Sequence, residues 1–138
     1  MPDEITRVDY YMGTIPNKVG EGARILNALK EAGINLTGCL GYPKTAKNAE
    51  IVVVVPEKAP TPAKVAKKAG LALGKKQKAF LVTGEDRLGA LAETMSKLAG
   101  AGINVVSTHA VSGGAGRYGA MIAVAPADLK KAAKALGI

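Results

Sequence analysis

A short turn in the second half of the chain combines residue types that suit a small charged ligand. Asp86 and Arg87 are followed by Gly89, and the apolar residues beyond this glycine are spaced as on one face of a helix. Such a turn presents free backbone N–H groups at a helix N-terminus, where a carboxylate is favoured. The glycine lets a ligand approach the backbone closely, and Asp86 is suited to hold an ammonium group. The turn is therefore a candidate binding site.

The same features occur 69 positions earlier, where Asn17 aligns with Asp86 and Gly20 with Gly89. Asn17 could hold an ammonium group only through its amide oxygen, so the two sites are expected to differ in affinity. An asparagine at the start of the following strand offers a donor and an acceptor in each half, and needs a partner. A simpler alternative is that the glycines only form the turn and cap the helix. The candidate ligand-binding residues are Asn17, Lys18, Val19, Gly20 and Asn35, and Asp86, Arg87, Leu88, Gly89 and Asn104.

These matches belong to an internal repeat that covers most of the chain. A shift of 69 positions, without a gap, places Thr14 on Thr83 and Val55 on Val124, and it aligns two copies of the run Ala-Gly-Ile-Asn. A repeat of this length is one small α/β unit used twice, because it is too long for a solenoid turn. A lone unit of about 65 residues buries a marginal core, so we expect the two units to pack together.

Hydrophobic periodicity predicts the order β-α-β-β-α in each half. Val19 and Leu88 are expected on the buried stripe of the first helix of each half, and Gly33 and Gly102 are expected to end these helices with left-handed caps. A second helix begins near Thr61 in the first half and near Pro126 in the second, and residues 74–78 are the predicted linker. The predicted strands are 7–13, 34–40, 51–55, 79–83, 103–111 and 118–125.

The sequence thus predicts an α+β protein of two ferredoxin-like βαββα units in tandem, with antiparallel sheets and helices on one face. The units are predicted over residues 5–74 and 78–138. A full ferredoxin-like unit has a fourth strand, for which neither half offers a distinct segment. We therefore expect truncated units that share or pair their sheet edges, and a homodimer that completes the sheets.

The segment from Glu85 to Ala92, with residues 101–105, resembles the signature of the ACT domain. That signature reads D-R-P-G-x-L, then about a dozen helical residues, then G-x-N-I. Residues 17–20 and 32–36 give a looser copy, so the resemblance spans nearly the whole chain as two ACT-type units. In both copies another residue, Val19 or Leu88, replaces the usual proline before the glycine, which loosens the turn without removing the glycine.

The ACT resemblance implies a function. ACT domains are regulatory modules that bind small molecules, most often amino acids, at interfaces between ACT units. The chain is therefore predicted to be a stand-alone, non-enzymatic, amino-acid-binding protein that acts in allosteric regulation and has no cofactor and no metal site. The ACT sites implied are the two turns with Asn35 or Asn104. Because no catalytic domain is attached, the regulated enzyme is expected to be a separate chain.

The charge of the chain supports an alternative from another class. The net charge is +8, with 19 Lys and Arg against 11 Asp and Glu, and a basic surface can bind nucleic acid. The alternative function is a basic RNA-binding protein of ferredoxin-like fold. Lysine among alanine is also ordinary composition for a solvated helix, and only 4% of residues are aromatic. We therefore do not expect nucleic acid to be the partner.

Other patterns give weaker signals. Residues 114–119 spell G-x-G-x-x-G, but a strand rather than a helix follows, so the run predicts a hairpin and no dinucleotide site. His109 and Cys39 are solitary and fall in different copies, which gives a metal site little support; a nucleophile–base pair would lack a third orienting group. Arg87 with Asn104 fits an acylphosphatase by residue type, but the carboxylates of the same loop would repel a phosphate.

Localisation is predicted to be cytoplasmic. Cys39 is the one cysteine, so no intramolecular disulfide can form, which suits a reducing compartment. Residues 1–4 lack the basic and apolar regions of a secretory signal. No apolar run approaches the roughly 20 residues needed to span a bilayer, so no membrane partner is expected.

Overall fold

A computed structural model describes residues 2–138 and shows the element order β-α-β-β-α twice. The predicted α+β class and the βαββα unit are both confirmed. The strands are β1 (Glu4–Pro16), β2 (Gly38–Pro43), β3 (Asn48–Pro56), β4 (Gln77–Glu85), β5 (Val105–Gly114) and β6 (Arg117–Val124). The helices are α1 (Glu21–Glu31), α2 (Ala63–Lys68), α3 (Ala90–Gly100), α4 (Leu129–Leu136) and the 3-10 turn η1 (Pro126–Asp128). None of the helices in residues 2–138 is long and apolar enough to cross a membrane.

The chain forms two compact units, which divide the sequence differently from the predicted ranges 5–74 and 78–138. Residues 9–77 make the N-terminal unit, whereas residues 2–8 join residues 78–138 in the C-terminal unit. Strand β1, with 13 residues, is long enough to serve both. Its first part supplies the additional strand for which the second half of the sequence offers no segment. The sequence predicts this strand only over residues 7–13, where valine and tyrosine are concentrated, and the observed strand extends beyond both ends of that range.

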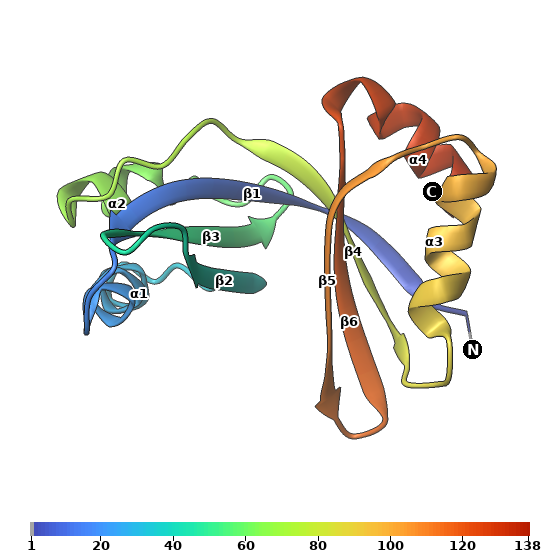
Figure 1. The fold of residues 1–138 in the computed structure, drawn as a ribbon, viewed down its shortest axis with the longest axis horizontal. Coiled ribbons are helices and arrows are strands. Elements are labelled where there is room, and N and C mark those ends of the chain that lie inside the picture. Colours follow the sequence, from blue (N-terminus) through green and yellow to red (C-terminus); the bar gives the residue numbers. More distant parts are fainter. Residues whose placement is uncertain (1) are drawn as a thin grey trace. The chain divides into compact units, whose positions relative to one another are not determined.

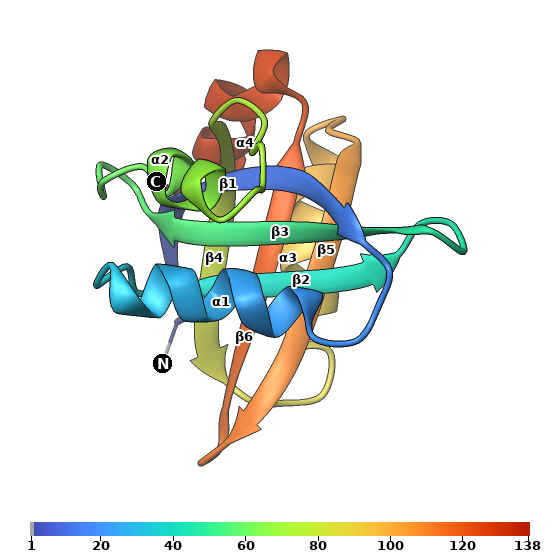
Figure 2. The same ribbon diagram turned by 90° about the vertical axis from the view of Figure 1, so that its left-hand side faces the viewer.

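In the N-terminal unit the strand order is β2-β3-β1, and β2 runs antiparallel to β3. Helices α1 and α2 cover one face of these strands (Figure 2). The stretch predicted as a linker contacts β1 through the Gly74 N–H, which donates to the Met12 carbonyl at 2.8 Å, and its last two residues begin β4. The buried core residues of this unit are Tyr11, Ile15, Ile25, Leu29, Ile51, Val53, Val55, Ala66 and Leu71.

In the C-terminal unit the strand order is β1-β4-β6-β5, and β6 runs antiparallel to both of its neighbours. Helices α3 and α4 cover one face (Figure 1). Ile5 of β1 packs against this core, which is why the first residues of the chain belong here. The buried core residues are Phe80, Val82, Ala90, Leu98, Ile103, Tyr118, Ala120, Ile122, Val124, Ala132, Ala133 and Leu136.

The predicted glycine caps are confirmed in both units. Gly33 and Gly102 follow α1 and α3 with φ of +75° and +73°, a conformation that favours glycine. The residue after each glycine donates its N–H back into the last helical turn, from Ile34 to Leu29 at 2.9 Å and from Ile103 to Leu98 at 3.0 Å. This is the Schellman arrangement, and it turns the chain from each helix toward the next strand.

Two details of the sequence prediction are wrong. Val19 and Leu88 lie on no buried stripe, because their side chains are fully exposed and the helices begin only at Glu21 and Ala90. The strands after these helices also start later than predicted, at Gly38 and Val105. The residues after each glycine first complete the helix cap, so they cannot yet belong to the sheet.

The burial pattern predicts a contrast between two leucines of the C-terminal unit. Leu98 is completely buried and Leu88 completely exposed. Leu98→Ala should lower the free energy of unfolding by about 2–5 kcal/mol, because it removes apolar contacts and leaves a cavity. Leu88→Ala should change it by less than about 0.5 kcal/mol. Urea denaturation followed by circular dichroism measures both, and equal effects would contradict the described packing.

Candidate functional site

Each unit has a hollow between the turn before its first helix and the hairpin of its next two strands. The hollow of the C-terminal unit has a volume of about 260 Å³, and that of the N-terminal unit about 390 Å³. The two are equivalent, because their lining residues pair at the repeat spacing of 69: Asn17 with Asp86, Tyr42 with Val111, and Ala49 with Tyr118. The repeat therefore places a hollow at the same position of both units, and that of the N-terminal unit is the larger of these two.

A left-handed glycine begins the first helix of each unit. Gly20 precedes α1 with φ +88° and Gly89 precedes α3 with φ +76°. No side chain caps either helix, although the first four N–H groups of a helix have no acceptor within it. The Glu21 and Ala90 N–H groups reach turn carbonyls only at 3.4 and 3.3 Å. Both helix N-termini thus keep backbone N–H groups that no side chain caps.

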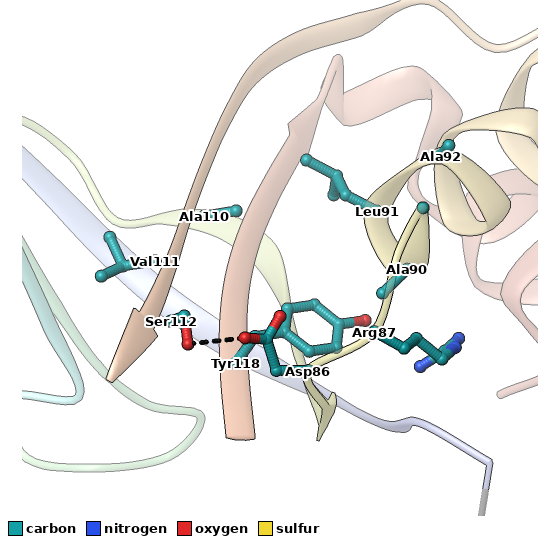
Figure 3. Close-up of a pocket in the computed structure, with 10 residues that line it drawn as sticks. Asp86, Arg87, Ala90, Leu91, Ala92, Ala110, Val111, Ser112 and Tyr118 are labelled. Atoms are coloured by element: carbon teal, nitrogen blue, oxygen red, sulfur yellow. Dashed lines mark hydrogen bonds between the residues drawn. The ribbon is translucent and has the colours of Figure 1, made fainter. Parts of the chain in front are cut away.

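The hollow of the C-terminal unit offers a carboxylate (Figure 3). Asp86 Oδ2 accepts a hydrogen bond from the Ser112 hydroxyl at 3.0 Å, and the Asp86 N–H donates to the Gly116 carbonyl at 2.8 Å. The turn is thereby fixed against the hairpin. An ionised carboxylate accepts several hydrogen bonds, so Asp86 retains acceptor sites for a ligand ammonium group. The ring of Tyr118 and small side chains such as Ala110 line the rest.

Arg87 borders this hollow, but its guanidinium is directed away from Ser112 and Val111 (Figure 3). It donates to the carboxylates of Asp3 at 3.0 Å and Glu93 at 2.7 Å, and these two contacts raise the Arg87 pKa. The side chain therefore stays charged and is already paired within the unit.

The Asp3 carboxylate also accepts a hydrogen bond from the Tyr118 hydroxyl at 2.7 Å. Hydrogen bonding from Arg87 lowers the Asp3 pKa, and burial together with the Asp3 hydrogen bond and charge raises the pKa of Tyr118 to about 12. The phenol therefore stays protonated and the carboxylate ionised at neutral pH. Asp3 and Tyr118 were missed in the sequence, since nothing in the motif points to a partner 84 positions before Arg87.

Two carboxylates line the hollow of the N-terminal unit, and both are ion-paired. Glu50 is buried in its wall and forms an ion pair with Lys44 at 3.0 Å, which raises the Lys44 pKa. Glu21 pairs with Arg24 at 2.8 Å, which lowers the Glu21 pKa. The repeat could not indicate Glu50 as a site residue, because the residue that aligns with it at the 69-residue spacing is Gly119. The two hollows therefore share a shape and differ in charge.

The turn of the N-terminal unit is held by Asn17. Its Nδ2 donates to the Thr45 carbonyl at 3.2 Å, and its N–H donates to the Lys47 carbonyl at 2.8 Å. The side-chain donor is therefore engaged, which leaves the amide oxygen for a ligand. The latter backbone bond is the repeat equivalent of that from Asp86 to Gly116.

The structure brings some predicted site residues together and separates others. The two turns line their hollows through Asn17 and Lys18 in one unit and through Asp86, Arg87 and Gly89 in the other. Gly20 begins α1 beside its hollow, and the exposed Val19 and Leu88 line neither. Asn35 and Asn104 follow the far ends of α1 and α3, are exposed, and line neither hollow. Within one unit, therefore, the predicted amide does not close the site.

Neither hollow presents a metal centre. Across residues 2–138, no three His, Cys, Asp or Glu side chains gather in a group that could hold a metal ion. Cys39 lines the hollow of the N-terminal unit, and partial burial raises the pKa of its thiol. A thiol is a weak nucleophile and a poor metal ligand while protonated, so Cys39 contributes mainly shape to the wall.

The left-handed backbone predicts opposite effects for two glycines of α3. A side chain at Gly89 would meet no atom within 4 Å, so the cost of Gly89→Ala comes from its positive φ alone, about 1–2 kcal/mol of folding stability. Gly100 ends the same helix without a positive φ, and Gly100→Ala should add about 0.5–1 kcal/mol. Thermal denaturation of both variants tests this, and a stabilising Gly89→Ala would contradict the described turn.

Comparison with known proteins gives matches at the level of structure. No family model matches the sequence, and no curated protein is detectably similar to it. Among solved structures, the protein BT0572 from Bacteroides thetaiotaomicron superposes with a TM-score of 0.74 at 17% identity, covering 97% of this chain and 88% of that one.

Regulatory subunits of aspartate kinase have the same architecture. The subunit from Thermus thermophilus superposes with a TM-score of 0.63 at 15% identity, covering 97% of this chain and 93% of that chain. The subunit from Thermus flavus gives 0.59 at 18% identity, covering 98% and 93%. These identities are low, so the likeness concerns the fold: this chain has the ferredoxin-like, ACT-type architecture that its sequence predicts.

Proposed function

We propose that this protein is a non-enzymatic regulatory protein that binds an α-amino acid in the hollow of each unit. The observation that carries the proposal is the repetition of one arrangement: a left-handed glycine, an uncapped helix N-terminus and a polar acceptor at the position of Asn17 or Asp86. Each part has a match in an α-amino acid. The shared fold of aspartate kinase regulatory subunits supports a regulatory role.

The ligand's charged groups have distinct partners in this proposal. Its carboxylate accepts hydrogen bonds from the backbone N–H groups that begin α1 or α3, where the helix dipole favours an anion. Its ammonium group donates to the Asp86 carboxylate in one hollow and to the Asn17 amide oxygen in the other. Asp86 is charged and Asn17 is not, while Glu21 and Glu50 of the N-terminal hollow are already ion-paired, so the C-terminal unit should hold the ammonium more tightly. The side chain of the ligand extends toward the hairpin.

A second copy of the chain is the proposed means of closing each site. Strand β5 lies at the end of its unit's strand order and exposes the apolar side chains of Val106 and Val111. Unpaired strand edges favour pairing with another chain. A homodimer built on such edges would form interfaces between ACT-type units, at which the exposed Asn35 and Asn104 could reach a ligand held by the opposite copy. The regulated enzyme is proposed to be a further, separate chain.

The RNA-binding alternative has one observation in its favour and one against it. The lysines of α2 and α4 form no ion pair with any residue of 2–138, so their charge is open to an anionic partner. Single-stranded RNA is recognised by bases stacked on exposed aromatic rings. Phe80 is 1% exposed and packs in the helix-covered core, so it offers no such platform. Amino-acid binding remains the better-supported function.

Ligand binding predicts a difference between two neighbouring acidic residues. A thermal-shift panel of the common amino acids identifies the ligand, and a hundredfold excess over its dissociation constant should stabilise the fold by about 2.7 kcal/mol. In calorimetry, Asp86→Asn should weaken binding by about 1.5–3 kcal/mol, because a charge-assisted hydrogen bond is lost. Glu85→Gln is the matched control, since Glu85 is adjacent, exposed and outside the hollow.

Asn35→Ala and Asn104→Ala test whether the asparagines close the site. Each should cost about 1–3 kcal/mol of binding if its amide contacts the ligand. Unchanged affinity in both would remove them from the site. The hollow itself is refuted as the site if Asp86→Asn and Gly89→Ala both bind the ligand as tightly as the parent.

The proposed homodimer predicts sensitivity to charge on the β5 edge. Val111→Lys places a charge on the regular part of an exposed strand and should shift the protein toward monomer in sedimentation velocity without ligand. Ile138→Lys adds the same charge at another exposed apolar position and should leave the dimer intact. A parent protein that sediments as a monomer at all concentrations would rule out the homodimer and leave the single-unit hollows unaffected.

A further inference from the structure

We propose that Asp3 is a positioning residue of the C-terminal hollow: it holds the Arg87 guanidinium and the Tyr118 hydroxyl away from the ligand, so that the hollow selects for an ammonium group. The inference rests on the proposed function for the identity of the site, and it adds a determinant of ligand class. Asp3 lies just before β1, far in sequence from the turn and the hairpin that it orders.

The contacts of Asp3 account for both side chains. Oδ1 accepts from Arg87 Nη1 at 3.0 Å, and Oδ2 lies 3.4 Å from Nη2 and accepts from the Tyr118 hydroxyl at 2.7 Å. The Asp3 side chain is 11% exposed and that of Arg87 35%. Since Glu93 takes Nη2 from the other side at 2.7 Å, both terminal nitrogens of the guanidinium are occupied by carboxylates. Two-point pairing of this kind fixes orientation as well as charge.

The space for the Asp3 carboxylate is created by Gly84. A Cβ at this position would overlap Asp3 Oδ1 and would lie 3.2 Å from the Tyr118 ring. Gly84 is directly opposite Tyr118 in the pairing of β4 with β6. Gly84 thus leaves space for the Asp3 carboxylate, and the Tyr118 hydroxyl and the Arg87 guanidinium both donate to it. These three features distinguish the arrangement from a chance surface ion pair.

The N-terminal unit lacks this arrangement, although it carries the same hollow. The counterpart of Tyr118 is Ala49, and the counterpart of Arg87 is Lys18, whose ion pair with Glu21 is long at 3.7 Å. Asp3 therefore acts on one hollow only. While Arg87 pairs with Asp3, it cannot neutralise Asp86 or bind an anionic group of a ligand. Asp3 thereby leaves Asp86 as the charged group that the C-terminal hollow presents to a ligand.

The test follows the Arg87 Nε–Hε resonance in ¹⁵N-labelled full-length protein during titration with inorganic phosphate. In the parent the resonance should not respond. Asp3→Asn keeps the shape of the side chain and removes the charge that pairs with Arg87 Nη1, while Glu93 still holds Nη2, so phosphate should bind there about tenfold more tightly or better. Gly84→Ala should give the same gain by displacing the carboxylate. Glu93→Gln is the matched control, because it removes the other carboxylate partner and leaves Asp3 in place, and should give no gain.

Two results would overturn the inference: a parent resonance that already responds to phosphate, or a folded Asp3→Asn variant whose resonance does not. The double variant Asp3→Asn with Arg87→Gln should lose the gain in phosphate affinity. If the double variant keeps that gain, the phosphate binds elsewhere and the inference is wrong. A second experiment compares the affinity for the amino acid identified by thermal shift with the affinity for the same acid without its amino group. Asp3→Asn should reduce the ratio of these two affinities. If no amino acid binds but the phosphate series behaves as stated, the proposed function fails and the positioning role of Asp3 stands.

Discussion

The left-handed conformation of one glycine before the first helix of each unit is the constraint on which the candidate sites depend. Gly20 and Gly89 are the N-cap residues of α1 and α3 and have no side chain with which to cap the helix, and the turn before each helix lies against the neighbouring hairpin. A capping serine or aspartate would occupy one of the backbone donors at the helix N-terminus and leave fewer of them for a ligand. The turn thus exchanges some helix stability for a small, charged, concave surface.

Shape and charge have diverged separately in the two copies. The shape depends on backbone contacts that both units share, such as the bonds from Asn17 to Lys47 and from Asp86 to Gly116. The charge depends on side chains with no counterpart, namely the pair of Glu50 with Lys44 in one unit and the Asp3 cluster in the other. A duplicated module can therefore keep one binding geometry while its two copies recognise different ligands or respond over different concentration ranges.

Most of the fold was predictable from the sequence because it is encoded locally. The glycine caps at Gly33 and Gly102, the apolar runs and the repeat each specify structure within a few residues. The errors concern features set by distant contacts. Nothing near Leu88 shows that the helix will begin two residues later, and the membership of residues 2–8 in the C-terminal unit depends on Ile5 packing on a core built from residues 80–136.

The candidate site was predictable to the same extent. Its backbone, the turn with Gly89 and Asp86, is a local motif, and the structure places it on a hollow. The rest of the site is formed by residues far from this turn in the sequence: Ser112 and Tyr118 belong to the hairpin, and Asp3 precedes β1. Asn104 was assigned by its type and its predicted strand, but the Schellman cap places it beyond the far end of α3.

The shared strand β1 also orders events during synthesis. Residues 2–8 leave the ribosome well before residues 78–138, which complete the unit to which they belong. At about 5–20 residues per second, roughly 4–14 s separate residue 8 from residue 78. Throughout that interval residues 9–77 can collapse into their own core while the leading segment remains without its strand partner. A chaperone or a protease can therefore bind residues 2–8 before β4 is available, whereas in the folded protein Ile5 of this segment packs against the core of the C-terminal unit.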